Sequence, residues 1–97
     1  MATELENQTV LRIKDPKQFA VFMLNDHYTT WEFCIHIICS VFQKSVREAD
    51  AITNDIHTKG RGMCGIYSYE VAETKASIVQ KQARKEGYPM RCSVEEY

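Results

Sequence analysis

The sequence predicts an α/β fold of the α+β kind, in which three helices pack on one face of a three-stranded antiparallel sheet in the order β-α-α-β-α-β. Strand-like apolar segments occupy residues 19–24, 63–67 and 90–94. Two stretches with helical apolar spacing separate the first two of these segments, and one separates the last two. Because the connections are short, we expect consecutive elements to pack directly on one another.

One domain is expected, because 97 residues are close to the usual size of a single core. We expect residues 1–17 to form a flexible N-terminal extension and residues 18–97 to form the core domain. Thr9–Ile13 alternate in polarity and could pair as a short strand in some context. Asp15-Pro16-Lys17 separate that stretch from the core.

The first strand and first helix meet at a polar corner. The apolar run of residues 19–24 stops at Asn25-Asp26, and a helix is predicted from about residue 30 to 44. Thr29 and Glu32 have the spacing of a capping box, in which Thr29 would cap the helix and Glu32 would reach back. The wide apolar face of this helix indicates that it lies at the centre of the fold.

The second helix is predicted from Val46 to Thr58. A second capping box, Ser45 with Glu48, opens it, and Gly60 is suited to end it. Its apolar residues form one narrow stripe.

The remaining elements follow a turn-forming segment at residues 59–62. Gly65, inside the second strand, indicates a bulge or a close backbone approach. The third helix is predicted from a Ser68 cap to about Glu86, with Gly87 just beyond. The third strand completes the sheet.

Composition excludes several classes of function. There are 12 basic and 13 acidic residues, a net charge of −1, which is unlike a nucleic-acid-binding protein. No apolar run is long enough to span a membrane, and the N-terminus is acidic and polar, unlike a signal peptide. We therefore expect a cytoplasmic protein, whose cysteines are reduced and mostly buried. These cysteines are Cys34, Cys39, Cys64 and Cys92.

Metal and thiol chemistry were weighed against packing roles. His36 and Cys39 could share a face of the first helix, but no second pair has the spacing of a zinc site. The other possible ligands are His27, His57 and the remaining cysteines. Cys34, Cys64 and Cys92 lie in apolar segments, which favours packing over nucleophilic catalysis. We expect no metal, no cofactor and no catalytic residue, and composition and spacing alone indicate a small α/β domain that acts as a binding module.

Three polar residues are candidates for binding a cation. One possibility is that Asn25 and Asp26 do no more than form a turn. The other is that their side-chain oxygens accept hydrogen bonds from an ammonium group. His57, near the end of the second helix, could interact with the helix dipole or could act as a neutral acceptor in a site. The residues alone leave these alternatives open.

A family resemblance extends this interpretation. Residues 24–33 (LNDHYTTWEF) resemble the segment V-N-D-D-Y-T-P-M-E-F of ClpS, the adaptor of the bacterial Clp protease. The resemblance continues through Ile56-His57 and residues 59–65, is strongest at residues 70–75 (EVAETK), and ends with residues 88–92. Together these motifs cover about residues 19–95 in order.

The resemblance implies a non-enzymatic adaptor. Such an adaptor binds proteins with an N-terminal Phe, Tyr, Trp or Leu and delivers them to the N-terminal domain of a Clp AAA+ unfoldase of the ClpA or ClpC type, which feeds the ClpP peptidase. It also implies a monomer whose extension is engaged during delivery. The α-amino group would be held by Asn25, Asp26 and His57, the side-chain pocket would be walled by Thr29, Cys34, Thr53, Ile56 and Met90 with Trp31 at its rim, and the unfoldase would dock on Glu70 and Lys75.

Three positions depart from the family pattern. His27 stands where a second Asp is frequent, which removes a negative charge near the ammonium site. Trp31 replaces a rim Met, and Thr53 stands where a Met commonly narrows the entrance. We expect altered specificity, with Ile or Val admitted. These departures keep one alternative open, a diverged ClpS paralogue that docks on the unfoldase and modulates or inhibits it with altered or weak degron specificity.

Overall fold

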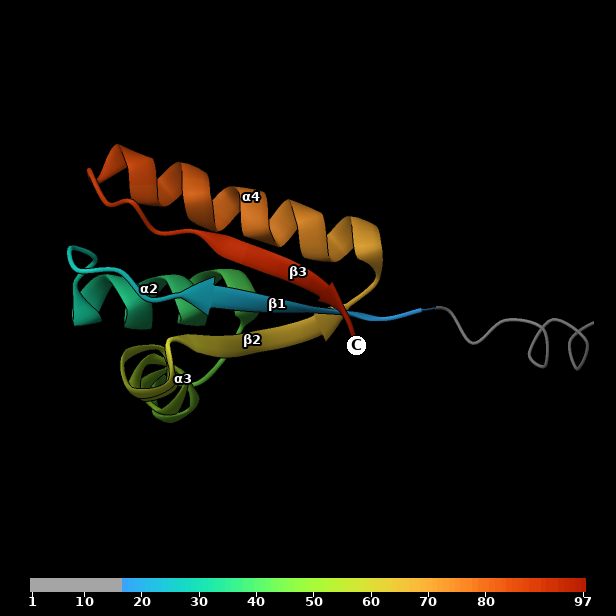
Figure 1. Cartoon of the computed structure of the whole chain (residues 1–97), viewed down its shortest axis with the longest axis horizontal. Coiled ribbons are helices and arrows are strands. Elements are labelled where there is room, and N and C mark those ends of the chain that lie inside the picture. Colours follow the sequence, from blue (N-terminus) through green and yellow to red (C-terminus); the bar gives the residue numbers. More distant parts are fainter. Residues whose placement is uncertain (1–16) are drawn as a thin grey trace, which may run out of the picture.

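A computed structural model describes residues 17–97 (Figure 1). The expected N-terminal extension therefore lies outside the described residues, except for Lys17. The predicted order of elements is confirmed. The elements are β1 (Phe19–Leu24), α2 (Trp31–Phe42), α3 (Val46–Lys59), β2 (Arg61–Tyr67), α4 (Tyr69–Lys85) and β3 (Cys92–Glu96).

The sheet is antiparallel, with β1 between β2 and β3. At the middle of β1, Val21 pairs with Gly65 on one side and with Val94 on the other. Figure 1 shows the sheet in front of α2, with α4 beside β3 and α3 beside β2. Val21 and Met23 are fully buried with residues of α2 and α4, because alternate residues of a strand face the same side. The core thus lies between the sheet and its helices.

The capping box predicted at the start of α2 is wrong, because the N-cap lies one residue later than predicted. The N-cap is Thr30, whose hydroxyl accepts a hydrogen bond from the Phe33 backbone at 3.1 Å. Thr29 is not available for that role because its backbone N–H and its hydroxyl both donate to Asp26. Glu32 accordingly lies within the first turn and not at the reach-back position.

The other predicted caps are confirmed, with small shifts of boundary. The Ser45 backbone donates to Glu48 at 2.9 Å and the Ser45 hydroxyl accepts from the Glu48 backbone at 3.1 Å, as a capping box requires. Ser68 caps α4 through its hydroxyl alone, which accepts from the Val71 backbone at 3.4 Å. α2 ends earlier than predicted, because Gln43 adopts a left-handed conformation with φ 52°. β2 begins two residues earlier than predicted and ends at the predicted residue, and β3 lies two residues later than predicted.

Glycines allow α3 to approach the sheet closely. Gly60 ends α3 with φ 90°. A Cβ at Gly62 would lie 2.6 Å from the Ile52 carbonyl oxygen, so only glycine fits under the helix. The predicted bulge near Gly65 is confirmed, since the β1–β2 register shifts between Val21 and Phe22.

Within residues 17–97, no helix is long and apolar enough to cross a membrane.

Candidate functional site

Backbone hydrogen bonds fix the corner after β1 against two other segments. The Asn25 N–H donates to the Gly60 carbonyl at 2.9 Å, just past the end of α3. The Leu24 N–H donates to the Arg91 carbonyl at 2.9 Å, just before β3. The corner therefore lies beside the last turn of α3, which carries His57, and beside the segment that carries Met90.

Asp26 organises the corner. Its Oδ1 accepts hydrogen bonds from the backbones of Tyr28 at 2.8 Å and Thr29 at 2.7 Å, and its Oδ2 accepts from the Thr29 hydroxyl at 2.7 Å. A carboxylate offers about four lone-pair sites, so these three donors leave room for one more donor at Oδ2. Asp26 thus fills the turn role and keeps capacity for a ligand.

The same contacts keep Asp26 ionised. Burial alone would raise the pKa of its carboxyl, but the hydrogen bonds from Thr29 and Tyr28, with the nearby His27, outweigh burial and lower that pKa below its ordinary value of 3.8. The corner therefore presents a negative charge throughout the neutral range. Asn25 precedes this carboxylate and is exposed.

His57 can act as a hydrogen-bond acceptor. Its Nδ1 lies 3.0 Å from the Thr53 carbonyl oxygen. Because a carbonyl only accepts, this contact places the proton on Nδ1 and leaves the lone pair of neutral His57 on Nε2. Its exposed imidazole lies against the Trp31 indole, with ring centroids 4.9 Å apart.

The predicted wall residues come from three segments and are buried. Cys34 on α2, Ile56 on α3 and Met90 before β3 belong to one hydrophobic cluster and are each 1% exposed. Thr29 is 8% exposed and Thr53 is fully buried. The Thr53 hydroxyl donates to the Ala49 carbonyl at 2.7 Å, so its proton is bonded within α3. The wall at this position is therefore less polar than the presence of a hydroxyl suggests.

The cysteines have the properties of packing residues. Burial, with the nearby Asp26 charge, raises the pKa of the Cys34 thiol to about 11. Burial also raises the pKa of Cys92 to about 12 and that of Cys64 further. These thiols are protonated at neutral pH, which argues against nucleophilic roles for them. Among the residues that the structure describes, no group of three His, Cys, Asp or Glu side chains is placed to hold a metal ion.

Glu70 and Lys75 border a second surface, a hollow of about 360 Å³ on α4. Val71 and Ile78 line it and are 43% and 38% exposed. Lys75 is partly engaged within the fold, since its Nζ donates to the Val41 carbonyl at 2.5 Å, at the end of α2. The sequence prediction did not include Val71, Thr74 and Ile78 in this surface. Helical spacing could have revealed them, because Thr74 and Ile78 follow Glu70 by four and eight residues and Val71 precedes Lys75 by four.

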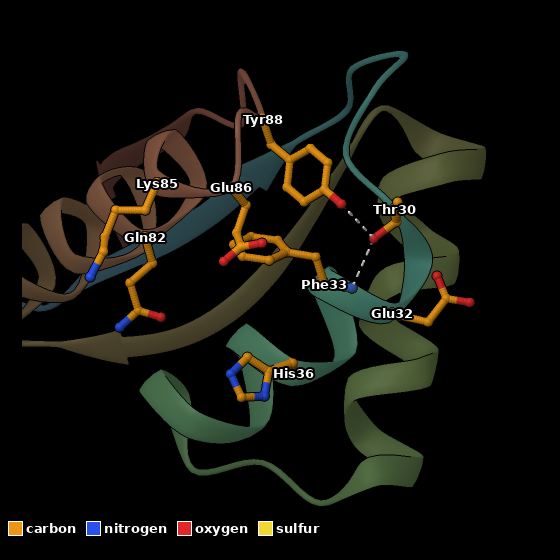
Figure 2. A pocket seen from close by; sticks show the side chains of 8 residues that line it. All are labelled: Thr30, Glu32, Phe33, His36, Gln82, Lys85, Glu86 and Tyr88. Atoms are coloured by element: carbon orange, nitrogen blue, oxygen red, sulfur yellow. Dashed lines mark hydrogen bonds between the residues drawn. The ribbon is translucent and has the colours of Figure 1, made fainter.

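A further pocket, of about 440 Å³, lies where α2 faces the C-terminal end of α4. Figure 2 shows Gln82, Lys85 and Glu86 on one side of it and Phe33 and His36 on the other. The Phe33 and Tyr88 rings pack edge to face, with centroids 5.1 Å apart. None of the predicted binding residues lines this pocket, and the sequence did not predict it. The remaining lining residues are Thr30 and Glu32.

Comparisons with known proteins identify one family. A family model described as "ATP-dependent Clp protease adaptor protein ClpS" matches residues 14–93. The ATP-dependent Clp protease adapter protein ClpS of Nitratidesulfovibrio vulgaris (strain DP4) is 50% identical over 84 residues, covering 87% of this chain and 81% of that protein. The protein of the same name from Helicobacter hepaticus is 43% identical over 94 residues, covering 97% and 95%.

A solved structure is also similar. The structure of Agrobacterium tumefaciens ClpS2 bound to L-phenylalaninamide superposes with a TM-score of 0.81 at 28% identity. The similarity covers 84% of this chain and 99% of that one.

Proposed function

Because the chain belongs to the ClpS family of adaptors for ATP-dependent Clp proteases, we propose that it captures polypeptides through a free α-amino group and a bulky apolar first side chain. In this proposal it performs no catalysis and needs no cofactor. It acts in the cytoplasm as a monomer and passes its cargo to a Clp protease.

The observation that best supports the proposal is that hydrogen-bond acceptors lie on the corner after β1 and on the last turn of α3, which the backbone hydrogen bond from Asn25 to Gly60 holds together. The ionised Asp26 has a remaining acceptor site at Oδ2, neutral His57 has Nε2, and the exposed Asn25 has an amide oxygen. An α-amino group is largely an ammonium at neutral pH and has three protons to donate. The arrangement suits that group in number and in charge.

Buried apolar residues next to these acceptors suit the first side chain. We propose that Thr29, Cys34, Thr53, Ile56 and Met90 form the wall of its pocket and that Trp31 forms the rim. The relative's ligand, L-phenylalaninamide, carries the same pair of features, a free amino group and a benzyl side chain.

The energies are adequate for a reversible adaptor. Each charge-assisted hydrogen bond contributes roughly 1.5–3 kcal/mol, and burial of a Phe or Leu side chain adds roughly 1.5–3 kcal/mol. The loss of translational, rotational and side-chain freedom on binding offsets much of this favourable free energy. The expected dissociation constant is on the order of micromolar.

We place the unfoldase-docking surface on the α4 face that carries Glu70 and Lys75. Exposed Val71 and Ile78 give this face an apolar centre between charged residues, which is typical of protein interfaces. The partner in the proposal is the N-terminal domain of a ClpA- or ClpC-type AAA+ unfoldase. Residues 1–17 are the segment that the unfoldase engages during delivery.

The alternative of a diverged paralogue with weak degron binding is not favoured. The structurally similar relative was solved with an amino-acid amide bound, and Asn25, Asp26 and His57 supply the expected acceptors here.

Titration of peptides that differ only in their first residue tests the proposed function. Peptides beginning with Phe, Tyr, Trp or Leu should bind with micromolar affinity, and those beginning with Asp or Gly should bind at least tenfold more weakly, because burial of a large apolar side chain is lost. Equal affinities across the panel would reject the proposal.

A further inference from the structure

A hydrogen bond joins α2 to α3 beside His57. Trp31 is the first residue of α2, and its indole Nε1 donates to Asp50 Oδ1 on α3 at 3.2 Å. The Trp31 ring also lies 4.9 Å from the His57 imidazole, with an angle of 31° between the ring planes. Asp50 and His57 lie two turns apart on the same face of α3, because residues spaced by seven share a helix face. The indole therefore bridges Asp50 and His57 along that face.

We propose that Asp50 is a positioning residue of the amino-terminus site. It anchors the Trp31 indole, and the anchored indole restrains the His57 imidazole in the orientation that presents Nε2 to the substrate. The proposal rests on the proposed function for its binding readout. Asp50 itself touches no substrate in this proposal.

The imidazole needs a second restraint. Its Nδ1 contact with the Thr53 carbonyl holds one ring atom, but a ring held at one atom can still tilt about that bond. The indole packed on its face restricts this tilt. Because His57 is otherwise exposed, fixing its ring before binding reduces the ordering cost that association would otherwise include.

Trp31 needs an anchor for the same reason. It is 37% exposed, and burial alone does not fix an indole at a protein surface. A hydrogen bond from Nε1 to a carboxylate is charge-assisted and directional, so it selects one orientation of the ring. Asp50 is the acceptor that provides this selection.

Direct attraction between Asp50 and the substrate ammonium is the competing explanation. Along the helix axis, at 1.5 Å per residue, Asp50 lies about 10 Å from His57 and Asp55 lies about 3 Å from it, although residues two apart point to different sides of a helix. Asp55 pairs with exposed Lys59 at 3.4 Å, whereas Asp50 accepts the hydrogen bond from Trp31. Asp55→Ala is a control for loss of a negative charge elsewhere on α3, and Asp50→Asn is the control for loss of charge at Asp50 itself.

The experiment compares the full chain with Asp50→Ala, Asp50→Asn and Asp55→Ala. Trp31 is the only tryptophan of the sequence, so the indole N–H signal in a nitrogen–proton NMR spectrum and the indole fluorescence both report on this contact. Asp50→Ala should shift the indole N–H signal upfield and speed its exchange with water. Asp50→Asn keeps an acceptor oxygen and should retain most of the downfield shift.

Binding of a Phe-ended peptide is measured in parallel. Asp50→Ala should weaken binding roughly three- to tenfold, which is less than the loss expected when a hydrogen bond to a charged group is removed outright. Asp50→Asn and Asp55→Ala should bind the peptide within about twofold of the parent. Parental affinity of Asp50→Ala would overturn the proposal. Equal weakening by all three variants would also overturn it, because the loss of negative charge, and not the loss of the indole anchor, would then explain the weaker binding. Circular dichroism checks that each variant is folded.

The two readouts separate this proposal from the proposed function. If the parent binds no Phe-ended peptide, the proposed function fails. The indole signal of Asp50→Ala then still decides whether Asp50 anchors Trp31, and an unchanged signal overturns the positioning role.

Discussion

At the scale of single residues, His57 is proposed to supply an acceptor for the bound amino group. Its Nδ1 contact with the Thr53 carbonyl leaves Nε2 as the acceptor, and a proton on Nε2 would remove that acceptor and add a repelling positive charge. Removal of the His57 side chain should therefore weaken binding.

We predict that His57→Ala weakens binding of a Phe-ended peptide about tenfold or more at pH 8, since a hydrogen bond to a charged group contributes roughly 1.5–3 kcal/mol. Calorimetric titration measures the difference in dissociation constant between parent and variant. A variant that binds as tightly as the parent from pH 5.5 to pH 8 would remove His57 from the mechanism.

Thr53 is the residue on which side-chain specificity is predicted to depend. It is fully buried, and its hydroxyl donates to the Ala49 carbonyl at 2.7 Å. A Met at this position is longer than Thr and would have to extend into the proposed pocket or displace its neighbours.

We predict that Thr53→Met lowers affinity for Ile- and Val-ended peptides more than for Phe-ended ones, by roughly 1–3 kcal/mol, the usual cost of overfilling a packed site. The ratio of affinities for Ile- and Phe-ended peptides measures this effect. If the parent and Thr53→Met reject Ile and Val equally, Thr53 does not set specificity.

At the scale of elements, the start of α3 determines where His57 lies. The capping box of Ser45 and Glu48 fixes the first turn of α3, and Gly60 fixes its end next to Asn25. His57 belongs to the last turn, so the helix has to be complete for the site to form.

We predict that Ser45→Ala destabilises the protein by about 1 kcal/mol, the usual cost of removing an N-cap side chain. In a domain of this size the melting temperature should fall by roughly 4–8 °C. Ser77→Ala, inside α4, is the control and should leave stability near that of the parent, since Ala favours helix interiors. Equal melting temperatures for Ser45→Ala and the parent would contradict the importance of this cap.

At the scale of the whole molecule, the proposed binding and docking sites lie on different elements. The proposed amino-terminus site lies at the corner after β1, on α2 and at the end of α3, whereas the proposed docking surface lies on α4. The two activities should therefore be separable by mutation.

We predict that Glu70→Lys leaves binding of a Phe-ended peptide within about twofold of the parent, since additivity holds for distant sites. The same change should weaken association with the N-terminal domain of a Clp unfoldase and slow degradation of a Phe-ended substrate. Glu73→Lys makes the same charge change one turn along α4, away from the surface that Glu70 borders. If Glu70→Lys and Glu73→Lys deliver substrate equally well, the docking surface lies elsewhere.

The sequence was sufficient for the fold because its local signals agree with one another. The Ser45 capping box, the left-handed Gly60 and the apolar run of β1 each act within a few residues, so pattern alone locates them. The N-cap of α2 was predicted at Thr29 and lies at Thr30, because the sequence offers two adjacent hydroxyls that could each accept the capping hydrogen bond. The carboxylate of Asp26, which binds Thr29, decides between them only in the folded corner.

The site was predictable only in part. The residue types of Asn25, Asp26 and His57 suggested acceptors, and family resemblance assigned them to one site. Spacing could not reveal that the Asn25 backbone bonds to Gly60 and so brings the corner to His57. The contact between Trp31 and Asp50 joins residues 19 positions apart, and no local pattern predicts such a contact.

Recognition of a free amino terminus is the central claim, and comparison of one Phe-ended peptide with its N-acetylated form tests it most directly. Acetylation removes the positive charge and two of the three donor protons while it keeps the side chain. The free peptide should bind with a dissociation constant on the order of micromolar, and the acetylated one at least a hundredfold more weakly, because each charge-assisted hydrogen bond is worth roughly 1.5–3 kcal/mol. Equal binding of the two peptides would contradict the assignment of Asn25, Asp26 and His57 to the amino group.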